Sequence, residues 1–127
     1  MDRLDVYRCE VCGNLVEVLH VGGGELMCCG KPMTRLTLRS TDIGQEKHLP
    51  VIEDSEDGIT IRIGEIPHPM TEEHLIEWVE VIGTDGSTRR IFLNSGDLPQ
   101  VHISIKKEEV REVRVYCNLH GLWSKIL

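Results

Sequence analysis

The sequence predicts a mainly β protein, in which a small N-terminal metal knuckle precedes an antiparallel β-sandwich. Three observations lead to this prediction. Apolar and polar residues alternate in short stretches after residue 48, turn-forming residues separate those stretches, and four of the five cysteines lie within the first 30 residues. Aromatic residues make up only 4% of the chain, so its core must rest on Val, Ile and Leu, of which the β-branched members favour strands.

The predicted strands lie in the second part of the chain. Strict alternation predicts two half-buried strands, at residues 59–63 and 101–105. Further strands fit residues 74–82, 89–93 and 110–117. Turn signals rich in Gly, Asp and Asn separate them, and short strands joined in this way are typical of an antiparallel β-sandwich. Residues 106–114 fit a helix as an alternative, because Glu and Arg are good helix formers.

The first part of the chain has a different character. Five glycines divide residues 1–36 into short apolar runs, which predicts a hairpin-rich knuckle. A segment of this size cannot bury enough apolar surface to be stable without a staple. The polar stretch at residues 39–47 predicts a linker and loop. We therefore expect two domains, a knuckle over residues 1–36 and the sandwich over residues 37–127.

The staple of the knuckle is predicted to be a metal ion. Cys9-x-x-Cys12 and the adjacent pair Cys28-Cys29 supply four thiolates, enough for a closed tetrahedral site. Zinc and a single iron both accept such a site, and a purely structural role is open. Disulfides are the alternative. They are disfavoured because the N-terminus has no apolar signal-peptide region, which predicts a reducing, cytoplasmic location.

Charge and hydropathy exclude two classes of partner. The formal charge of -7 and the pI near 5.3 argue against nucleic acid or an anionic membrane surface, because phosphate binding needs clustered Lys and Arg. No apolar stretch approaches the length of a membrane span. Any attraction for an anion must therefore be local.

A second set of ligand-type residues occupies predicted loops and strand ends. Its members are His48, His68, His74, Cys117 and His120. A sandwich gathers ligands from distant parts of the chain at such positions, and the Cys117-x-x-His120 spacing matches other mixed thiolate and imidazole sites. Two further histidines receive no role, because His102 alternates outward on its strand and His20 lies beside a glycine-rich loop.

Two other kinds of site compete for this second set. Type 1 copper sandwiches also carry a Cys and a nearby His near the C-terminus, but no methionine follows Cys117 and the last one is Met70. A hydrolytic Cys and His pair is the other alternative. No nucleophile elbow or oxyanion-type loop accompanies Cys117, which disfavours it.

Taken together, the motifs resemble desulfoferrodoxin, the two-iron class of superoxide reductase. The matching segments are Cys9-x-x-Cys12, Cys28-Cys29, Glu46-Lys47-His48-x-Pro50, His68-Pro69-Met70, His74 and Cys117-Asn118-x-His120-Gly121-x-Trp123. They follow the family's order over almost the whole chain. Smaller members of the family lack the N-terminal cysteines, so all four of them place this chain with the two-iron class.

The resemblance implies a fold and two irons per chain. Residues 1–36 are expected to form a desulforedoxin-like domain whose iron is bound by Cys9, Cys12, Cys28 and Cys29. Residues 37–127 are expected to form an immunoglobulin-like sandwich, whose iron has four equatorial imidazoles and an axial thiolate, from His48, His68, His74, His120 and Cys117. The sixth position is open. In the family the last histidine binds through the ring nitrogen nearer the backbone, which singles out His120.

The resemblance also implies an activity, one-electron reduction of superoxide to hydrogen peroxide at non-haem ferrous iron. Lys47 is expected to attract superoxide, and Glu46 to bind the ferric iron after the product departs. The implied partners are a second copy of the chain, in a homodimer, and a rubredoxin-like or other reductase as electron donor. A non-enzymatic iron electron-transfer protein and a structural zinc protein are the alternative functions, which metal analysis and a superoxide pulse would separate.

Overall fold

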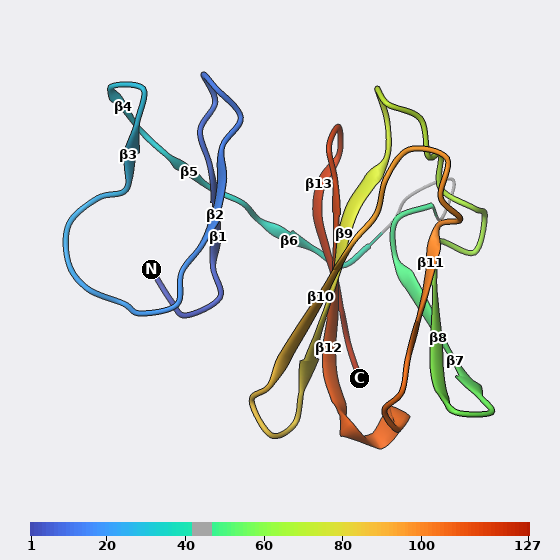
Figure 1. Cartoon of the computed structure of the whole chain (residues 1–127). Helices are drawn as coiled ribbons and strands as arrows, with labels where there is room; N and C mark the ends of the chain where they lie inside the picture. Colours follow the sequence, from blue (N-terminus) through green and yellow to red (C-terminus); the bar gives the residue numbers. More distant parts are fainter. Residues whose placement is uncertain (42–46) are drawn as a thin grey trace. The chain divides into compact units, whose positions relative to one another are not determined.

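The computed structural model describes residues 1–41 and 47–127. Within them the chain forms two compact units, Met1–Thr37 and Leu38–Leu127 (Figure 1). Glu46, a predicted catalytic residue, lies outside the described residues. Across the described part of the chain, no helix is long and apolar enough to span a membrane.

The first unit is a set of very short strands. They are β1 (Val6–Arg8), β2 (Leu15–Glu17), β3 (Met27–Cys28), β4 (Lys31–Pro32) and β5 (Thr34–Arg35). Three of them form an antiparallel sheet in the order β2-β1-β5, and β3 and β4 form a separate hairpin. Within this unit the buried hydrophobic residues are Val6, Cys9 and Val18. So small a core matches the prediction of a knuckle that needs a staple.

The second unit is a sandwich of two sheets. Its strands are β6 (Leu38–Arg39), β7 (Pro50–Ser55), β8 (Gly58–Ile63), β9 (Ile76–Gly83), β10 (Thr88–Phe92), β11 (Gln100–Ile103), β12 (Val110–Cys117) and β13 (Gly121–Ile126). One sheet has the order β10-β9-β12-β13-β6 and the other β11-β8-β7. All their pairings are antiparallel except that of β13 with β6. The predicted antiparallel sandwich is therefore confirmed, with one parallel edge strand.

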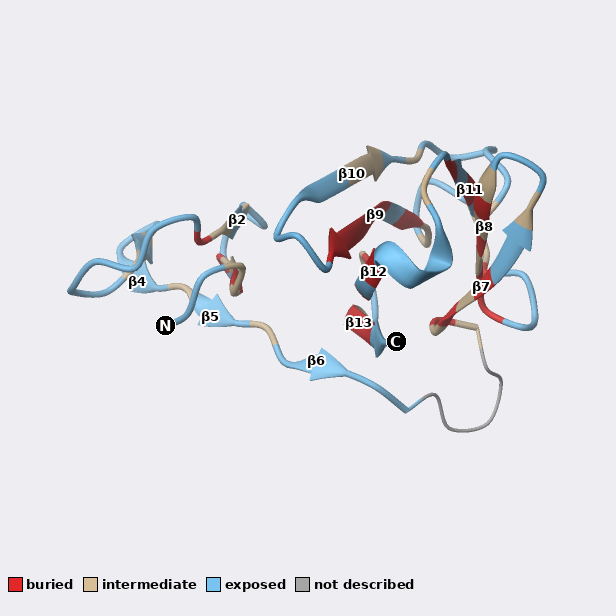
Figure 2. Cartoon of the chain, turned by 90° about the horizontal axis from the view of Figure 1, so that it is seen from below, coloured by how far each residue is buried: buried red, intermediate tan, exposed pale blue. Residues whose placement is uncertain are grey.

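Alternation explains how the two sheets enclose a core. In β8, Ile59, Ile61 and Ile63 are fully buried, whereas Thr60 and Arg62 between them are partly exposed. The facing sheet contributes apolar residues of β9 and β12, such as Val79 and Val115. Figure 2 shows the buried residues of this unit concentrated on β8, β9, β12 and β13. Burying one face of each sheet in this way fixes the strand register.

Several predicted boundaries are wrong in detail. The strand expected at 74–82 begins only at Ile76, because His74 belongs to a turn closed by hydrogen bonds with Thr71. The helix considered for 106–114 is only one 3-10 turn, Lys107–Glu109, before β12 begins. Arg39, expected in a linker, belongs to β6 and pairs with Trp123. Strands β7 and β13 were missed.

Candidate metal centres

The four N-terminal cysteines come from two tight turns. Cys9 follows β1, and the amide of Gly13 donates to its carbonyl at 2.9 Å, so the chain folds back and brings Cys12 alongside. Cys28 ends β3 and Cys29 opens the turn to β4. Gly13 and Cys29 both have positive φ, +82° and +52°. Glycine adopts this conformation freely, but Cys29 does so at a cost that the hairpin must offset.

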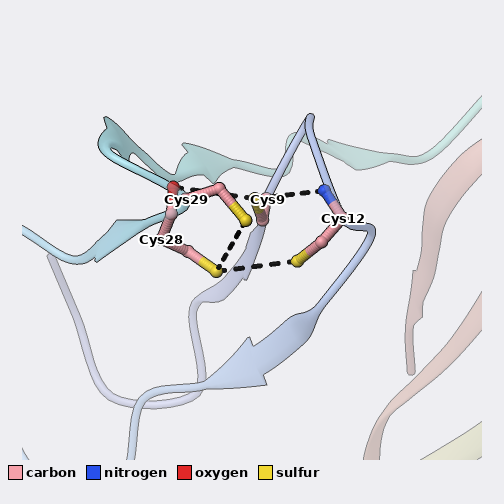
Figure 3. A group of neighbouring side chains, drawn as sticks. All are labelled: Cys9, Cys12, Cys28 and Cys29. Carbon is pink, nitrogen blue, oxygen red and sulfur yellow. Dashed lines mark hydrogen bonds between the residues drawn. The ribbon is translucent and has the colours of Figure 1, made fainter.

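The four sulfurs fit a tetrahedral metal (Figure 3). All of them lie within 4.8 Å of one another, with 3.6 Å between the sulfurs of Cys12 and Cys28 and 4.0 Å between those of Cys28 and Cys29. A tetrahedral site with metal–sulfur bonds of about 2.3 Å separates its sulfurs by about 3.8 Å. All five cysteines of the chain are free, so no disulfide takes the place of the predicted metal.

Hydrogen bonds make the four thiols unequal. The amide of Cys12 donates to the Cys9 sulfur at 3.4 Å, and backbone donors of this kind lower the pKa of Cys9 to about 6. The neighbouring sulfurs have the opposite effect on Cys29, whose pKa is raised to about 12, chiefly through its interaction with Cys12. One thiolate is thus ready for a cation, and metal binding must displace protons from the crowded sulfurs.

The second set of predicted ligands gathers at one end of the sandwich. His48 precedes β7, His68 follows β8, His74 precedes β9, Cys117 ends β12, and His120 lies in the turn to β13. The ligand atoms of His48, His74, Cys117 and His120 lie within 4.8 Å of one another. His68 joins them through ring contacts with His48 and His74. The structure therefore brings together all five residues that the sequence singled out.

The four imidazoles form a closed ring. In the order His48, His68, His74, His120 and back to His48, neighbouring ring centroids are 4.7–4.9 Å apart and each ring is tilted by 65–84° against the next. Nε2 of His48 lies 3.0 Å from Nδ1 of His120. The Cys117 sulfur lies 3.8 Å from the same Nδ1. His120 thus presents its backbone-side nitrogen to the cluster, as the resemblance implied.

Buried nitrogen atoms in this ring are ready to bind a cation. His68 is buried, and its Nδ1 lies 2.7 Å from the carbonyl oxygen of Pro69, to which it donates in the neutral ring. Within the described residues, Nε2 of His68 and Nε2 of His74 have no hydrogen-bond partner. Burial lowers the pKa of His68 to about 4 and also lowers that of His74. Both rings are therefore neutral at pH 7, the form that binds metals.

The thiolate end of the cluster is enclosed. Cys117 is fully buried, and burial raises the pKa of its thiol. Backbone N–H groups of Leu119 and His120 point at the sulfur and oppose this increase. A buried thiolate needs a compensating positive charge, which a metal ion provides. His120 is exposed, so the cluster runs from the core to the surface.

Asn118 joins two of the ligand loops. Its Nδ2 donates to the carbonyl of Glu73 at 3.0 Å, and its Oδ1 accepts from the amide of Leu75 at 3.0 Å. These bonds tie the loop that carries His74 to the turn between Cys117 and His120. Sequence reasoning quoted Asn118 in the family motif but gave it no role.

Lys47 is placed next to this cluster by a close backbone contact. It is half-buried, and its positive charge is one of the causes that lower the pKa of His74, after burial and the neighbouring histidines. Gly64, with φ of +83°, packs against it: a Cβ there would lie 2.5 Å from the carbonyl oxygen of Lys47. This glycine was missed, and its only sequence signal is its position just after a predicted strand.

The five ligand-type groups define the chemistry that this end can support. An octahedral metal has six positions, so four imidazoles and one thiolate leave one for a small molecule. Type 1 copper is disfavoured, because its sites use two histidines with the cysteine and four meet here. The two histidines that received no role, His20 and His102, are both exposed. The ring Nε2 of His102 lies 3.0 Å from the Ser55 hydroxyl.

Comparison with known proteins matches both parts of the chain to one family. The family model for desulfoferrodoxin matches residues 40–126, and the model for the desulfoferrodoxin N-terminal domain matches residues 1–36. A desulfoferrodoxin from Syntrophotalea carbinolica is 50% identical over 123 residues, covering 97% of this chain and 96% of the relative. A superoxide reductase from Pyrococcus abyssi is 36% identical over 108 residues, covering 72% of this chain and 94% of the relative. The crystal structure of the superoxide reductase from Treponema pallidum matches with a TM-score of 0.78 and 26% identity, over 97% of this chain and 98% of that one.

Proposed function

This chain belongs to the desulfoferrodoxin family, and we infer that it is a superoxide reductase with two iron centres. The observation that carries this function is the ring of four imidazoles beside a buried thiolate, which supplies five ligands. We propose His48, His68, His74, His120 and Cys117 as ligands of the reactive iron, and Cys9, Cys12, Cys28 and Cys29 as ligands of the other.

When bound, the second iron supplies one electron and an open position for a small anion. The protein supplies what surrounds it. Imidazole binds metals in its neutral form and so adds no charge, and the Cys117 thiolate donates electron density from the buried side. In the overall reaction one superoxide, one electron and two protons give one hydrogen peroxide. The experiment that tests this function is a superoxide pulse on the reduced, iron-loaded chain, which must consume superoxide stoichiometrically without releasing oxygen.

We propose Lys47 as a catalytic residue that attracts superoxide, because an acidic protein needs a local positive charge beside the reactive iron. Replacing Lys47 with alanine is expected to lower the second-order rate constant with superoxide by about 10-fold and to weaken its salt dependence. Pulse radiolysis at several ionic strengths measures both quantities.

Lys107→Ala is the matched control for this prediction. Lys107 begins the 3-10 turn that precedes β12, whereas Cys117 ends β12, so the control removes the same charge one strand length from the cluster. Its rate constant should equal that of the wild type. Equal rate constants for Lys47→Ala and the wild type would refute the proposed role.

We also propose Glu46 as a catalytic residue, on the resemblance alone, because it lies outside the described residues. A carboxylate that binds the oxidised iron once the product has left would occupy the sixth position. Glu46→Ala is therefore expected to change the visible and electron paramagnetic resonance spectra of the oxidised second site. Spectra identical to those of the wild type would contradict this role.

Further assignments complete the proposal. We propose residues 1–36 as a desulforedoxin-like domain and residues 37–127 as the superoxide reductase domain, supported by the separate family matches and the two compact units. We also propose that the chain works as a cytoplasmic homodimer in electron transport, with a rubredoxin-like or other reductase as donor. Sedimentation analysis of the loaded chain tests the dimer, and reduction kinetics with candidate donors test the partner.

A further inference from the structure

Trp123 occupies a buried position beside the second metal cluster. It lies in β13, opposite Val115 of β12, and only 5% of its surface is exposed. It belongs to the apolar core between the two sheets. Within the described residues its indole Nε1 has no hydrogen-bond partner. A buried indole usually finds such a partner, so the apolar contacts made by its face must offset this cost.

The imidazole of His48 stacks on this indole. The two ring centroids are 4.4 Å apart and the planes are nearly parallel, at 8°. The contacts of His48 with His68 and His120 are different, because those rings meet edge-on at 65° and 84°. A parallel contact over a flat indole allows the imidazole to slide but resists rotation out of the plane.

Ligand imidazoles are held in orientation by contacts outside the ligand set, most often a hydrogen bond from the second ring nitrogen. His68 has the carbonyl of Pro69 at 2.7 Å, and the loop of His74 is tied by Thr71 and Asn118. His48 stands at the end of a loop, two residues before β7. One face of its ring lies against the rigid indole of Trp123.

We propose that Trp123 is a positioning residue of the second metal centre: its stacked indole sets the plane of His48, so that Nε2 is directed at the bound metal. Arg39 of the adjacent strand β6 also contacts this indole, with its guanidinium carbon 5.6 Å from the ring centroid. The inference rests on the proposed assignment of His48 as a ligand. It adds a residue that touches neither metal nor substrate.

The test compares Trp123→Phe, which keeps a flat face, with Trp123→Met, which keeps apolar bulk without one. In the full chain with both sites loaded with iron, release of iron from the second site to a chelator is followed by its thiolate absorption. Trp123→Met is expected to weaken iron retention by about 10- to 100-fold, as the loss of a contact outside the ligand set does elsewhere. Trp123→Phe is expected to stay close to the wild type, and the four-cysteine iron serves as an internal reference.

Trp78→Met is the matched control. Trp78 is also 5% exposed, but it pairs with Tyr116, the neighbour of Val115 on β12, so it lies on the opposite face of the same sheet. There it stacks on Tyr116, with ring centroids 5.8 Å apart. If Trp78→Met weakens iron retention as much as Trp123→Met, the effect is general destabilisation and the proposal is wrong. Wild-type retention in Trp123→Met would also overturn it.

Two further measurements keep the outcome decisive. His48→Ala should lose iron readily, and if it does not, the ligand assignment fails rather than the role of Trp123. The wild-type chain loaded with zinc provides a test that needs no core variant. Its His48 ring protons should be shifted upfield by the indole ring current relative to those of His68 and His74, and the absence of that shift refutes the stacked arrangement.

Discussion

Replacing Cys9 with serine is expected to unfold the N-terminal unit, Met1–Thr37, while leaving the sandwich folded. The unit has a very small core, and Cys9 is part of it, only 3% exposed. Structural zinc sites in zinc-finger peptides contribute about 10–16 kcal/mol of apparent binding free energy, and in domains as small as this unit the free energy of metal binding is folding free energy. Amide hydrogen exchange, resolved by residue, should show loss of protection confined to residues 1–37. Metal analysis should show the iron content reduced from two to one per chain.

His20→Ser is a suitable control, because His20 is exposed in the same unit and contributes no predicted ligand. It should keep both irons and full protection. Normal protection in the Cys9→Ser chain would show that the unit folds without its metal. The Cys9→Ser chain also tests whether the first iron carries electrons or only stabilises its unit. If its rate constant with superoxide is unchanged but its reduction by a donor protein is slower, the first iron carries electrons.

Replacing Cys117 with serine is expected to have the largest effect on the reaction. The variant loses the thiolate that would bind the second iron and its electron density, and the rate constant with superoxide should fall by at least about 100-fold, the upper end of what a lost contact outside the ligand set costs. The thiolate absorption of the second site should disappear. Serine also places a more polar hydroxyl in the buried position, which costs stability that thermal unfolding of the metal-free chain would measure.

Val115→Ala controls for that loss of stability. Val115 lies two residues earlier in β12, is fully buried in the same core and provides no ligand. Its chain should be less stable but should react with superoxide at the wild-type rate. Comparable loss of rate in both variants would mean that packing at the end of β12, and not the thiolate, controls the reaction.

The sequence predicted β8 from its two different faces, and β9 and β12, which are mostly buried on both faces, from their β-branched residues and flanking turns. Strand β8 was evident, because Ile59, Ile61 and Ile63 point inward while Thr60 and Arg62 point outward. Strand β13 was missed, since three consecutive residues, 122–124, are buried and the alternation disappears. Strand β7 begins with a proline and ends in acidic residues, which resemble a loop. Period-2 patterns detect strands with one wet face, and a strand covered on both faces is found only where its composition and flanking turns mark it.

The candidate site was predictable in its ligands and not in their surroundings. Cysteine and histidine carry the chemistry in their side chains, so spacing and family motifs were enough to find them. The role of Trp123 depends on the register of β13 against β12 and on the loop that carries His48, 75 residues earlier in the chain. Gly64 matters because its φ is positive and the carbonyls of Lys47 and Ile66 pass close to it. Such long-range contacts leave no local pattern.

The arrangement of ligands along the chain has a consequence for the order of assembly. Cys117 and His120 lie in one hairpin turn, whereas His48 reaches His120 across 72 residues. Short loops close faster and with a smaller entropic cost than long ones. The β12–β13 hairpin is therefore expected to form early in folding and to bring two of the ligands together. A metal ion bound to these two ligands would then favour the folding of the rest of the sandwich around it. Metal supply would then influence the rate of maturation as well as the final stability.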